Sequence, residues 1–384
     1  MSHYDDLETR SADERRAAQD AALRAVAGIG LDALEGRPVL RKSELAARQA
    51  EAPPFGDLRV GDASHVFQSP GPIYEPGGMG RDWWRIGRFL HAAGIGRGAM
   101  VQNCFGYHLT PAGHMFESGA RAVGARVLPA GTGQTDLQVR AAADVRATAY
   151  AGTPDFLKVI LDRADATGVP LHYECAAVGG GALFPSLRAE YAERGIACLQ
   201  CYATADLGLV AYESAGQGGP HEGMIVDEGV IVEIVRPGTG DRVPDGAVGE
   251  VVVTSLNPDY PLVRFATGDL SAMMEGASPC GRTGPRIRGW LGRADQTAKV
   301  KGMFVRPEQV AAFVARHPEV RAARVTVTRE GEMDAMSVAV EADGGDEAAW
   351  AASVAEVLRL KGRVERVASL PNDGKVIDDR REYG

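Results

Sequence analysis

The chain has 384 residues, of which 45% are hydrophobic and 24% are charged, and its formal charge at pH 7 is −9. This length and composition predict two or three globular domains that bury a large core. A negative net charge without a run of five basic residues argues against a surface that follows nucleic-acid phosphates. We therefore expect small molecules, and no nucleic acid, as partners.

The N-terminal sequence MSHYDDLETRSADERR is acidic and polar, whereas a signal peptide is basic and then apolar. No stretch approaches the roughly 18 apolar residues of a membrane-spanning helix, so we expect a cytoplasmic protein with no membrane partner. The five cysteines are irregularly spaced, which is typical of reduced thiols. Cys198 and Cys201 have CxxC spacing, but they fall in the apolar run IACLQCY, where a strand directs residues three apart to opposite faces. We predict two buried strand thiols.

The first third of the chain alternates between helical and strand patterns. Residues 11–29 carry apolar residues at helical spacing and predict an amphipathic helix. Residues 67–80 are rich in proline and glycine, which excludes a helix or an interior strand. A helix at 81–93 and a strand at 100–105 follow, and residues 106–129 repeat that order. This alternation favours α/β layers around a mainly parallel sheet.

Ligand sites in such folds lie at the carboxyl ends of strands, and three predicted strands end in suitable residues. Tyr107 and His108 directly follow the strand at 100–105, although a surface histidine is an equally good interpretation of His108. The strand that begins at residue 147 runs into a Gly-Thr-Pro turn. The strand at 175–178 ends in three glycines, which let a flat ring approach the backbone closely. A plain flexible loop would explain the same glycines.

The second half of the chain predicts a change of architecture. Residues 224–235 and 248–254 predict strands of an antiparallel subdomain. The apolar run from Pro261 ends in Thr-Gly-Asp at 267–269, a predicted turn that could direct one carboxylate at two vicinal hydroxyls. Gly-Asp is also common at ordinary strand ends.

The C-terminal sequence predicts a separate small domain. A strand, an amphipathic helix, two further strands and an Ala-rich helix at 347–364 follow residue 295, which together make a small α+β unit. We predict an N-terminal domain of residues 1–294 and a C-terminal lid of residues 295–384.

In this order and at this spacing, the segments resemble the motifs of adenylate-forming enzymes, specifically the phenylacetate–CoA ligase family, over about residues 37–380. The resemblance implies an α/β fold with a large N-terminal adenylate-forming domain, which has layered, mainly parallel sheets and an antiparallel subdomain, and a small α+β lid. The nucleotide contacts it implies are Ser69, Gly71, Gly180, Gly181, Ala182, Cys201, Tyr202, Thr204, Asp269 and Arg293. The acyl-pocket residues it implies are Tyr107, His108, Thr153, Pro154 and Phe156.

The family's roles are carried over to matching positions. Tyr202 would stack on adenine, Thr204 would touch phosphate, and Asp269 would hold the ribose hydroxyls. Three residues are implied in catalysis, namely Lys375, Asp206 and Thr204. Asp206 would bind Mg²⁺ in place of the family's glutamate, and Oδ or Oε ligands suit this ion equally. Asp295 would be the hinge.

Two departures from the family pattern are apparent. Glu75 stands where the family's phosphate loop has a lysine, and prolines stand where it has hydroxyls. A negative charge there is unfavourable for polyphosphate. Ser214 and Ser278 replace two thiolates of the family's structural zinc site, of which His221 and Cys280 remain. Serine is a poor zinc ligand, so we predict that this zinc is absent.

The activity implied is that of an ATP-dependent acid–CoA ligase, which activates an aromatic or arylacetic acid as acyl-AMP with Mg²⁺ and transfers it to CoA. One alternative is an enzyme that passes the acyl group to an amine or a carrier protein. Another, suggested by the altered phosphate loop, is a non-catalytic protein that binds a nucleotide or an aryl acid. The expected partners are the acid, ATP and CoA, and a homodimer is compatible with the sequence.

Overall fold

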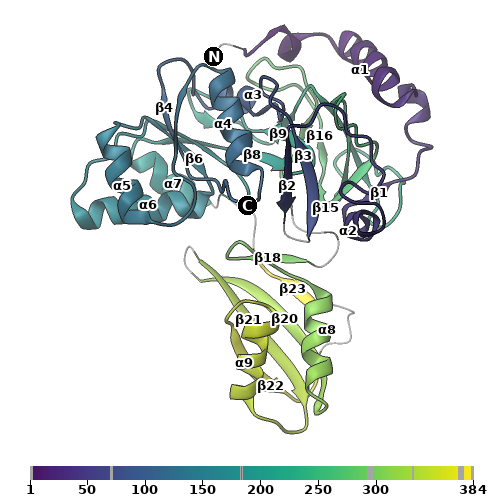
Figure 1. The fold of residues 1–384 in the computed structure, drawn as a ribbon, viewed down its shortest axis with the longest axis vertical. Coiled ribbons are helices and arrows are strands. Elements are labelled where there is room, and N and C mark those ends of the chain that lie inside the picture. The colour runs from purple at the N-terminus through teal and green to yellow at the C-terminus, as the bar shows by residue number, and fades with distance from the viewer. Residues whose placement is uncertain are drawn as a thin grey trace. The chain divides into compact units, whose positions relative to one another are not determined.

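The computed structural model describes residues 3–69, 72–181, 183, 185–291, 294, 297–330, 333–370 and 376–381. The chain divides into two compact units, residues 1–291 and 292–384 (Figure 1). The boundary expected from the sequence lies three residues further along the chain than this division.

A nine-stranded sheet forms the centre of the larger unit, in the order β16-β17-β12-β9-β8-β7-β6-β4-β5. Five neighbouring strands run parallel, namely β5 (Arg126–Pro129), β4 (Met100–Asn103), β6 (Ala149–Gly152), β7 (Cys175–Val178) and β8 (Ala197–Thr204). Four antiparallel strands extend it, namely β9 (Gly208–Tyr212), β12 (Met224–Val226), β17 (Arg286–Ile287) and β16 (Met273–Met274). The predicted α/β class is confirmed.

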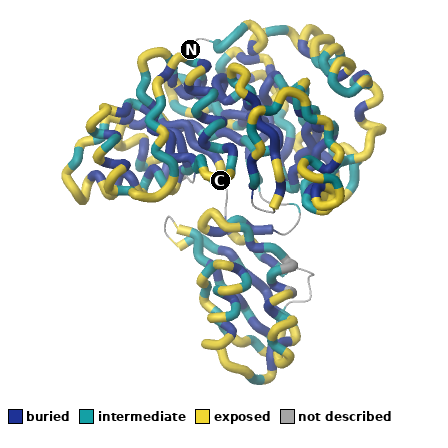
Figure 2. The backbone as a smooth tube through the Cα atoms, in the orientation of Figure 1, coloured by how far each residue is buried: buried dark blue, intermediate teal, exposed yellow. Residues whose placement is uncertain are grey.

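Helices connect the parallel strands because parallel neighbours require a crossover. They are α3 (Ile86–Ala92), α4 (Ala112–Ala122), α5 (Thr135–Asp144), α6 (Pro154–Thr167) and α7 (Pro185–Glu193). Phe89 on α3 and Phe116 on α4 meet edge to face in the core, with ring centroids 6.4 Å apart. The strands behind these helices form the continuous buried centre of the unit (Figure 2).

A second sheet, of four strands, lies in the same unit in the order β1-β15-β14-β13. Its strands are β1 (Leu40–Arg41), β15 (Phe265–Ser271), β14 (Gly249–Ser255) and β13 (Val230–Val235). β13, β14 and β15 pair antiparallel, as predicted for this part of the chain, whereas β1 joins β15 in parallel. Two small hairpins are β2 (His65–Ser69) with β3 (Ile73–Gly77), and β10 (Ala215–Gly216) with β11 (Gly219–Pro220).

The N-terminal segment contains η1 (Asp6–Thr9), α1 (Ala12–Ala27), η2 (Leu31–Ala33) and α2 (Lys42–Glu51). The predicted amphipathic helix is confirmed as α1. Ser11 accepts a hydrogen bond from the Glu14 backbone N–H, and the Glu14 side chain accepts one from the Ser11 N–H. This reciprocal arrangement satisfies donors that a helix N-terminus otherwise leaves free.

The smaller unit has its own sheet, in the order β22-β21-β20-β23, and a separate core. Its elements are β18 (Ala298–Val300), β19 (Met303–Val305), α8 (Pro307–Arg316), β20 (Val320–Glu330), β21 (Met333–Ala342), α9 (Glu347–Val357), β22 (Arg363–Val367) and β23 (Ile377–Asp379). Phe313 on α8 and Trp350 on α9 are fully buried against this sheet.

Two predicted helix boundaries are wrong. The helix expected from Arg81 begins at Ile86, because Asp82 and Arg85 have positive φ and the Asp82 carboxylate accepts the Gly87 N–H at 2.8 Å. The helix expected to reach residue 364 ends at Val357. The chain turns at Arg359, whose φ is +56°, and then forms β22.

The cysteine prediction is confirmed, since Cys198 and Cys201 are buried free thiols on β8. None of the helices that the structure describes has the length and apolar character that a membrane crossing needs.

Candidate active site

The carboxyl ends of β4, β6 and β7 bring three of the predicted segments together. Gly180, after β7, has a φ of +69°, and a Cβ placed on it would lie 3.8 Å from Phe105 and 3.9 Å from Thr153. The Gly181 carbonyl accepts a hydrogen bond from the Gln200 side chain at 2.8 Å. This hydrogen bond connects the glycine segment to β8, and the Gly180 backbone lies beside Phe105.

The residues predicted for the acyl pocket differ in exposure. Tyr107 is half-buried, and its hydroxyl accepts a hydrogen bond from Asn103 at 2.8 Å, whereas His108 is exposed. Pro154, the first residue of α6, is buried, and Phe156 is half-buried.

Sequence reasoning missed the aromatic neighbours of Tyr107. His114 on α4 lies with its ring 5.3 Å from Tyr107 and 5.1 Å from Phe67 on β2. His65 stacks on Phe67 at 5.5 Å. No local pattern signals this group, because it forms only where α4 packs against the β2–β3 hairpin.

Asp269 lies in a β-bulge and not in the predicted turn. Thr267, Gly268 and Asp269 fall within β15, where Leu270 pairs with Glu250 and Ala266 pairs with Val252. Three residues therefore oppose the single residue Val251, and Gly268 takes a φ of +76° to accommodate them. Bulges of this kind re-aim a side chain. The prediction of a turn was wrong because Gly-Asp also suits a bulge.

The Asp269 carboxylate is held on both oxygens. Tyr202 donates its hydroxyl to Oδ2 at 2.8 Å, and Trp290 donates its indole N–H to Oδ1 at 2.9 Å. The residue is 9% exposed, and a carboxylate oxygen can accept more than one hydrogen bond. The structure thus brings Tyr202 and Asp269 together. Trp290 was missed, although it follows closely in the run GWLG.

The end of β8 carries Thr204 and leads to Asp206. The Thr204 hydroxyl oxygen accepts the Leu207 N–H at 3.1 Å, which leaves its proton available for donation. The Asp206 side chain is fully buried and forms an ion pair with Lys42, Oδ2 to Nζ, at 2.5 Å. Its Oδ1 has no hydrogen-bond partner among the described residues. Lys42 was missed, because it is 164 residues away in the sequence.

The predicted phosphate loop forms the β2–β3 hairpin. The Glu75 carboxylate is fully buried and accepts hydrogen bonds from the Ser69 hydroxyl and, at 3.2 Å, from the Ser69 N–H. Burial and the Asp206 charge raise the pKa of Glu75 to about 8, although Lys42 and the bonds from Ser69 oppose this. Glu75 therefore occupies two donors that the resemblance assigns to phosphate.

The carboxylates of this site fit Mg²⁺. Asp206 offers a buried oxygen that has no partner in the described part of the chain, and Mg²⁺ commonly binds one or two carboxylates together with substrate phosphates. The described residues contain no group of three His, Cys, Asp or Glu that could bind a metal by itself. Asp206 would thus hold the ion only together with a phosphate ligand.

The residues left of the zinc site do not fit zinc. The Ser278 hydroxyl lies 3.0 Å from the Cys280 sulfur, and the Arg282 guanidinium donates to that sulfur at 3.5 Å. Burial opposes the thiolate, but hydrogen bonds from Ser214, Ser278 and Arg282 outweigh it and lower the pKa of Cys280 to about 7. The Arg282 guanidinium thus supplies positive charge at the sulfur. One thiolate alone could not complete the four ligands of a tetrahedral zinc site.

Five predicted residues lie outside the described part of the chain: Gly71, Ala182, Arg293, Asp295 and Lys375.

Comparisons with known proteins identify the family of this chain. The family of AMP-binding enzymes matches residues 85–257. A phenylacetate-coenzyme A ligase of Thermus thermophilus is 30% identical over 330 residues, which are 81% of this chain and 73% of the relative. A phenylacetate-coenzyme A ligase of Aromatoleum evansii is 28% identical, over 75% of this chain and 68% of its own length. Among solved structures, a 2-hydroxyisobutyryl-CoA ligase in complex with 2-HIB-AMP and CoA shares the fold, with a TM-score of 0.82 and 24% identity over 98% of this chain and 92% of that chain.

Proposed function

We propose that this chain, an AMP-forming acid–thiol ligase of the phenylacetate–CoA ligase family, activates an aromatic or arylacetic acid as an acyl-adenylate and transfers the acyl group to CoA. Activation is required because a carboxylate repels a thiolate and has no leaving group. Adenylation removes the charge and provides AMP as the leaving group.

The observation that carries this proposal is the connection between two carboxylates. Tyr202 on β8 fixes Asp269 on β15, and the same strand leads to Asp206, one oxygen of which has no partner among the residues that the structure describes. One carboxylate can accept ribose hydroxyls while the other faces phosphate. This division of tasks supports nucleotide chemistry more directly than the fold does, because one fold hosts many functions.

The reaction has two balanced steps. An oxygen of the acid attacks the α-phosphorus of ATP in line, so that a new P–O bond forms as the bond to pyrophosphate breaks. The CoA thiol then loses its proton, its sulfur attacks the acyl carbon, and AMP leaves with the electrons of the broken C–O bond. Bound Mg²⁺ would offset the phosphate charge in the first step.

The residues of the chain would divide this work. Asp269 would orient the ribose, Tyr202 would stack on adenine, and the Thr204 hydroxyl would donate to a phosphate oxygen. Lys375 would approach the α-phosphate in the first step and leave before the second, as the lid rotates about Asp295. Such preorganised charges act most strongly where charge develops in the transition state.

An aromatic substrate is supported by the surroundings of the glycine segment. Phe105 stacks on Phe116 with ring centroids 4.1 Å apart, next to Gly180. Tyr107 and Thr153 lie at neighbouring strand ends. We propose that a flat acyl group is bound between these residues, which agrees with the names of the relatives.

A second candidate function is a protein that binds AMP or an acyl-adenylate without forming it. The contact between Glu75 and Ser69 favours this candidate, because it occupies two donors of the phosphate loop. Such a protein would bind AMP at Asp269 but would not exchange pyrophosphate.

Pyrophosphate exchange into ATP tests the proposal with a panel of aryl, arylacetic and short aliphatic acids. We expect exchange with at least one aromatic acid, and a thioester after addition of CoA. Exchange limited to aliphatic acids would contradict the aromatic assignment. The absence of exchange with every acid, together with tight AMP binding, would instead support the second candidate.

A further inference from the structure

We propose that Lys42 is a nucleotide-contacting residue whose ammonium group binds the pyrophosphate end of ATP, in place of the lysine that the phosphate loop lacks. The inference rests on the proposed function, since it requires ATP as a ligand. Sequence reasoning assigned phosphate binding to the β2–β3 hairpin alone, whereas this inference adds a residue of α2.

The position of Lys42 suits this role. It is the first residue of α2, and the aligned N–H groups of a helix N-terminus add positive potential at the same point. The Lys42 side chain is 28% exposed, whereas that of its partner Asp206 is fully buried. Lys42 is thus the member of the ion pair that a ligand can reach.

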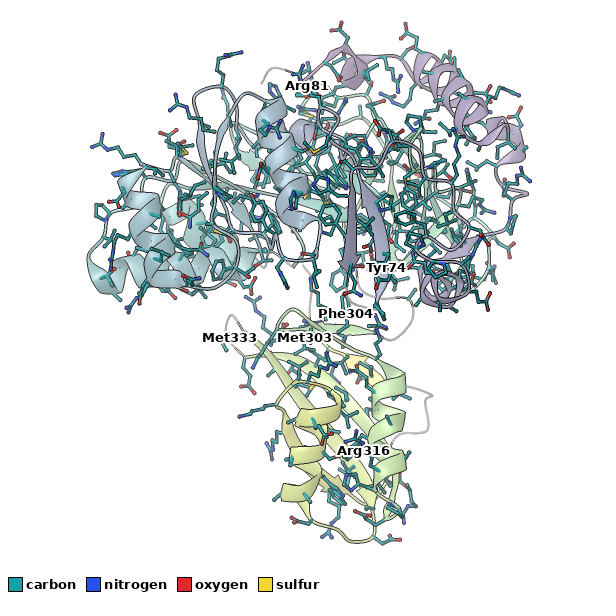
Figure 3. The ribbon with its side chains drawn as sticks, in the orientation of Figure 1. Tyr74, Arg81, Met303, Phe304, Arg316 and Met333 are labelled. Atoms are coloured by element: carbon teal, nitrogen blue, oxygen red, sulfur yellow. The ribbon has the colours of Figure 1, made fainter. Side chains whose placement is uncertain are left out.

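Helix α2 is anchored to the phosphate hairpin. The Gln49 side chain donates to the Tyr74 carbonyl and accepts from the Tyr74 N–H, both at 2.8 Å. Gln49 is buried, and Tyr74 on β3 directly precedes Glu75 (Figure 3). These two bonds fix the register of α2 against β3, so Lys42 and Glu75 are held in a constant relationship.

Polar atoms beside the Lys42–Asp206 ion pair lack partners among the described residues. Asp206 keeps one oxygen without a partner among the described residues, and the Tyr260 hydroxyl nearby is also buried and unpartnered. When Mg²⁺ and phosphate reach Asp206, Lys42 can move from the carboxylate to a phosphate oxygen.

The competing explanation is structural, in which Lys42 only neutralises a buried carboxylate. Both explanations predict that loss of Lys42 lowers stability, because an unpaired buried charge is costly. They differ in the ligand that is affected. If Lys42 contacts the pyrophosphate end, its loss weakens the binding of ATP but not of AMP. If its role is structural, its loss weakens the binding of both nucleotides equally.

Calorimetric titration of Lys42→Met with MgATP and with AMP distinguishes them. We expect ATP affinity to fall about ten- to hundred-fold, the scale of one charge-assisted hydrogen bond. AMP affinity should change by less than about threefold. Equal losses for both nucleotides, or none for ATP, would overturn the inference. If Lys42→Met does not fold, Lys42→Gln removes the charge but can still donate to Asp206.

The chain offers a matched control and a rescue. Lys158 on α6 also has a 28% exposed side chain and binds two carboxylates, Asp162 and Glu190, so Lys158→Met should change neither affinity. Adding Glu75→Lys to Lys42→Met places an ammonium group back on the hairpin. This double variant should recover at least about tenfold in ATP affinity, and the absence of recovery would contradict a phosphate contact.

Failure of this inference can be told apart from failure of the proposed function, because binding is measured without turnover. A wild-type chain that binds ATP but exchanges no pyrophosphate would refute the function and still allow the Lys42 test. A wild-type chain that binds ATP no more tightly than AMP would overturn the Lys42 contact by itself.

Discussion

At the scale of single residues, the candidate site depends on carboxylates whose oxygens are directed by hydrogen bonds. Asp269 is held by Tyr202 and Trp290, and Asp206 is held by Lys42. Hydrogen bonds fix the orientation of one carboxylate, and an ion pair fixes that of the other. The orientations of the two carboxylates are therefore set before a ligand binds.

Replacing Asp269 by alanine should weaken AMP binding at least tenfold. The reason is the loss of two hydrogen bonds to a charged acceptor, each contributing roughly 1.5–3 kcal/mol. Calorimetry measures the effect. Trp290→Phe is the matched variant, since it removes one donor to Asp269 while the carboxylate stays, and it should cause a smaller loss. Unchanged AMP affinity in Asp269→Ala would exclude Asp269 from the site.

Cys280 should be the cysteine that alkylates first, with a rate that rises through about pH 7. Its pKa is lowered to about 7, so the reactive thiolate is present above that pH. Burial raises the pKa of Cys104 and Cys198 to about 12 and that of Cys175 to about 11, so these stay protonated. Mass spectrometry after brief iodoacetamide treatment at pH 6, 7 and 8 measures the difference.

Alkylation of Cys280 also tests whether zinc is bound at this site. A zinc-bound thiolate would be protected from alkylation, and a chelator would accelerate labelling. We expect no effect of the chelator and less than one zinc per chain by metal analysis, with Cys280→Ser as the unlabelled control. One tightly bound zinc per chain would contradict the role of Arg282 at this sulfur.

At the scale of elements, the bulge in β15 directs the Asp269 carboxylate, which is the role that the sequence analysis assigned to a turn. It inserts residues opposite Val251 and directs the Asp269 side chain at Tyr202 and Trp290. The strand thereby stays paired on both sides of the site. Rigid strands position functional groups more accurately than loops do.

Gly268→Ala should destabilise the chain by about 1–2 kcal/mol and also weaken AMP binding, because alanine disfavours the φ of +76°. Gly94→Ala is the matched control. Gly94 has a φ of +82° in open space, so it carries the same backbone cost away from the site. Thermal denaturation with AMP titration separates the effects. Equal AMP affinity in both variants would show that the bulge does not position Asp269.

At the scale of the whole molecule, the chain consists of two units, each with its own core. The nucleotide residues described above all belong to the larger unit. The proposed lysine of the smaller unit, Lys375, lies outside the described residues, and its role follows from the resemblance alone.

Lys375→Ala should reduce acyl-adenylate formation by about 10²–10³, the usual scale for one electrostatic contact in a transition state. Thioester formation from synthetic acyl-adenylate should be nearly unchanged, because the lysine would then have left the site. The two half-reactions are measured separately on the variant. Equal losses in both, or a loss in neither, would contradict a mechanism in which the lid alternates between two positions.

The sequence by itself determined the elements that rest on local patterns. The helical spacing of apolar residues predicted α1, and alternating helix and strand patterns predicted β4 to β8. The motif residues Tyr202 and Asp269 were also identified in sequence, and the structure brings them to 2.8 Å. These signals are local because propensity, capping and alternation act over a few neighbouring residues.

Only the tertiary structure decided the partners of the charged groups. Lys42 pairs with Asp206, which is 164 residues away in the sequence, and Glu75 accepts a hydrogen bond from Ser69 across the β2–β3 hairpin. Burial then raises the pKa of Glu75 to about 8, and the Asp206 charge adds to that effect. No sequence pattern encodes these contacts, because burial and charge pairing depend on which distant segments share one low-dielectric site.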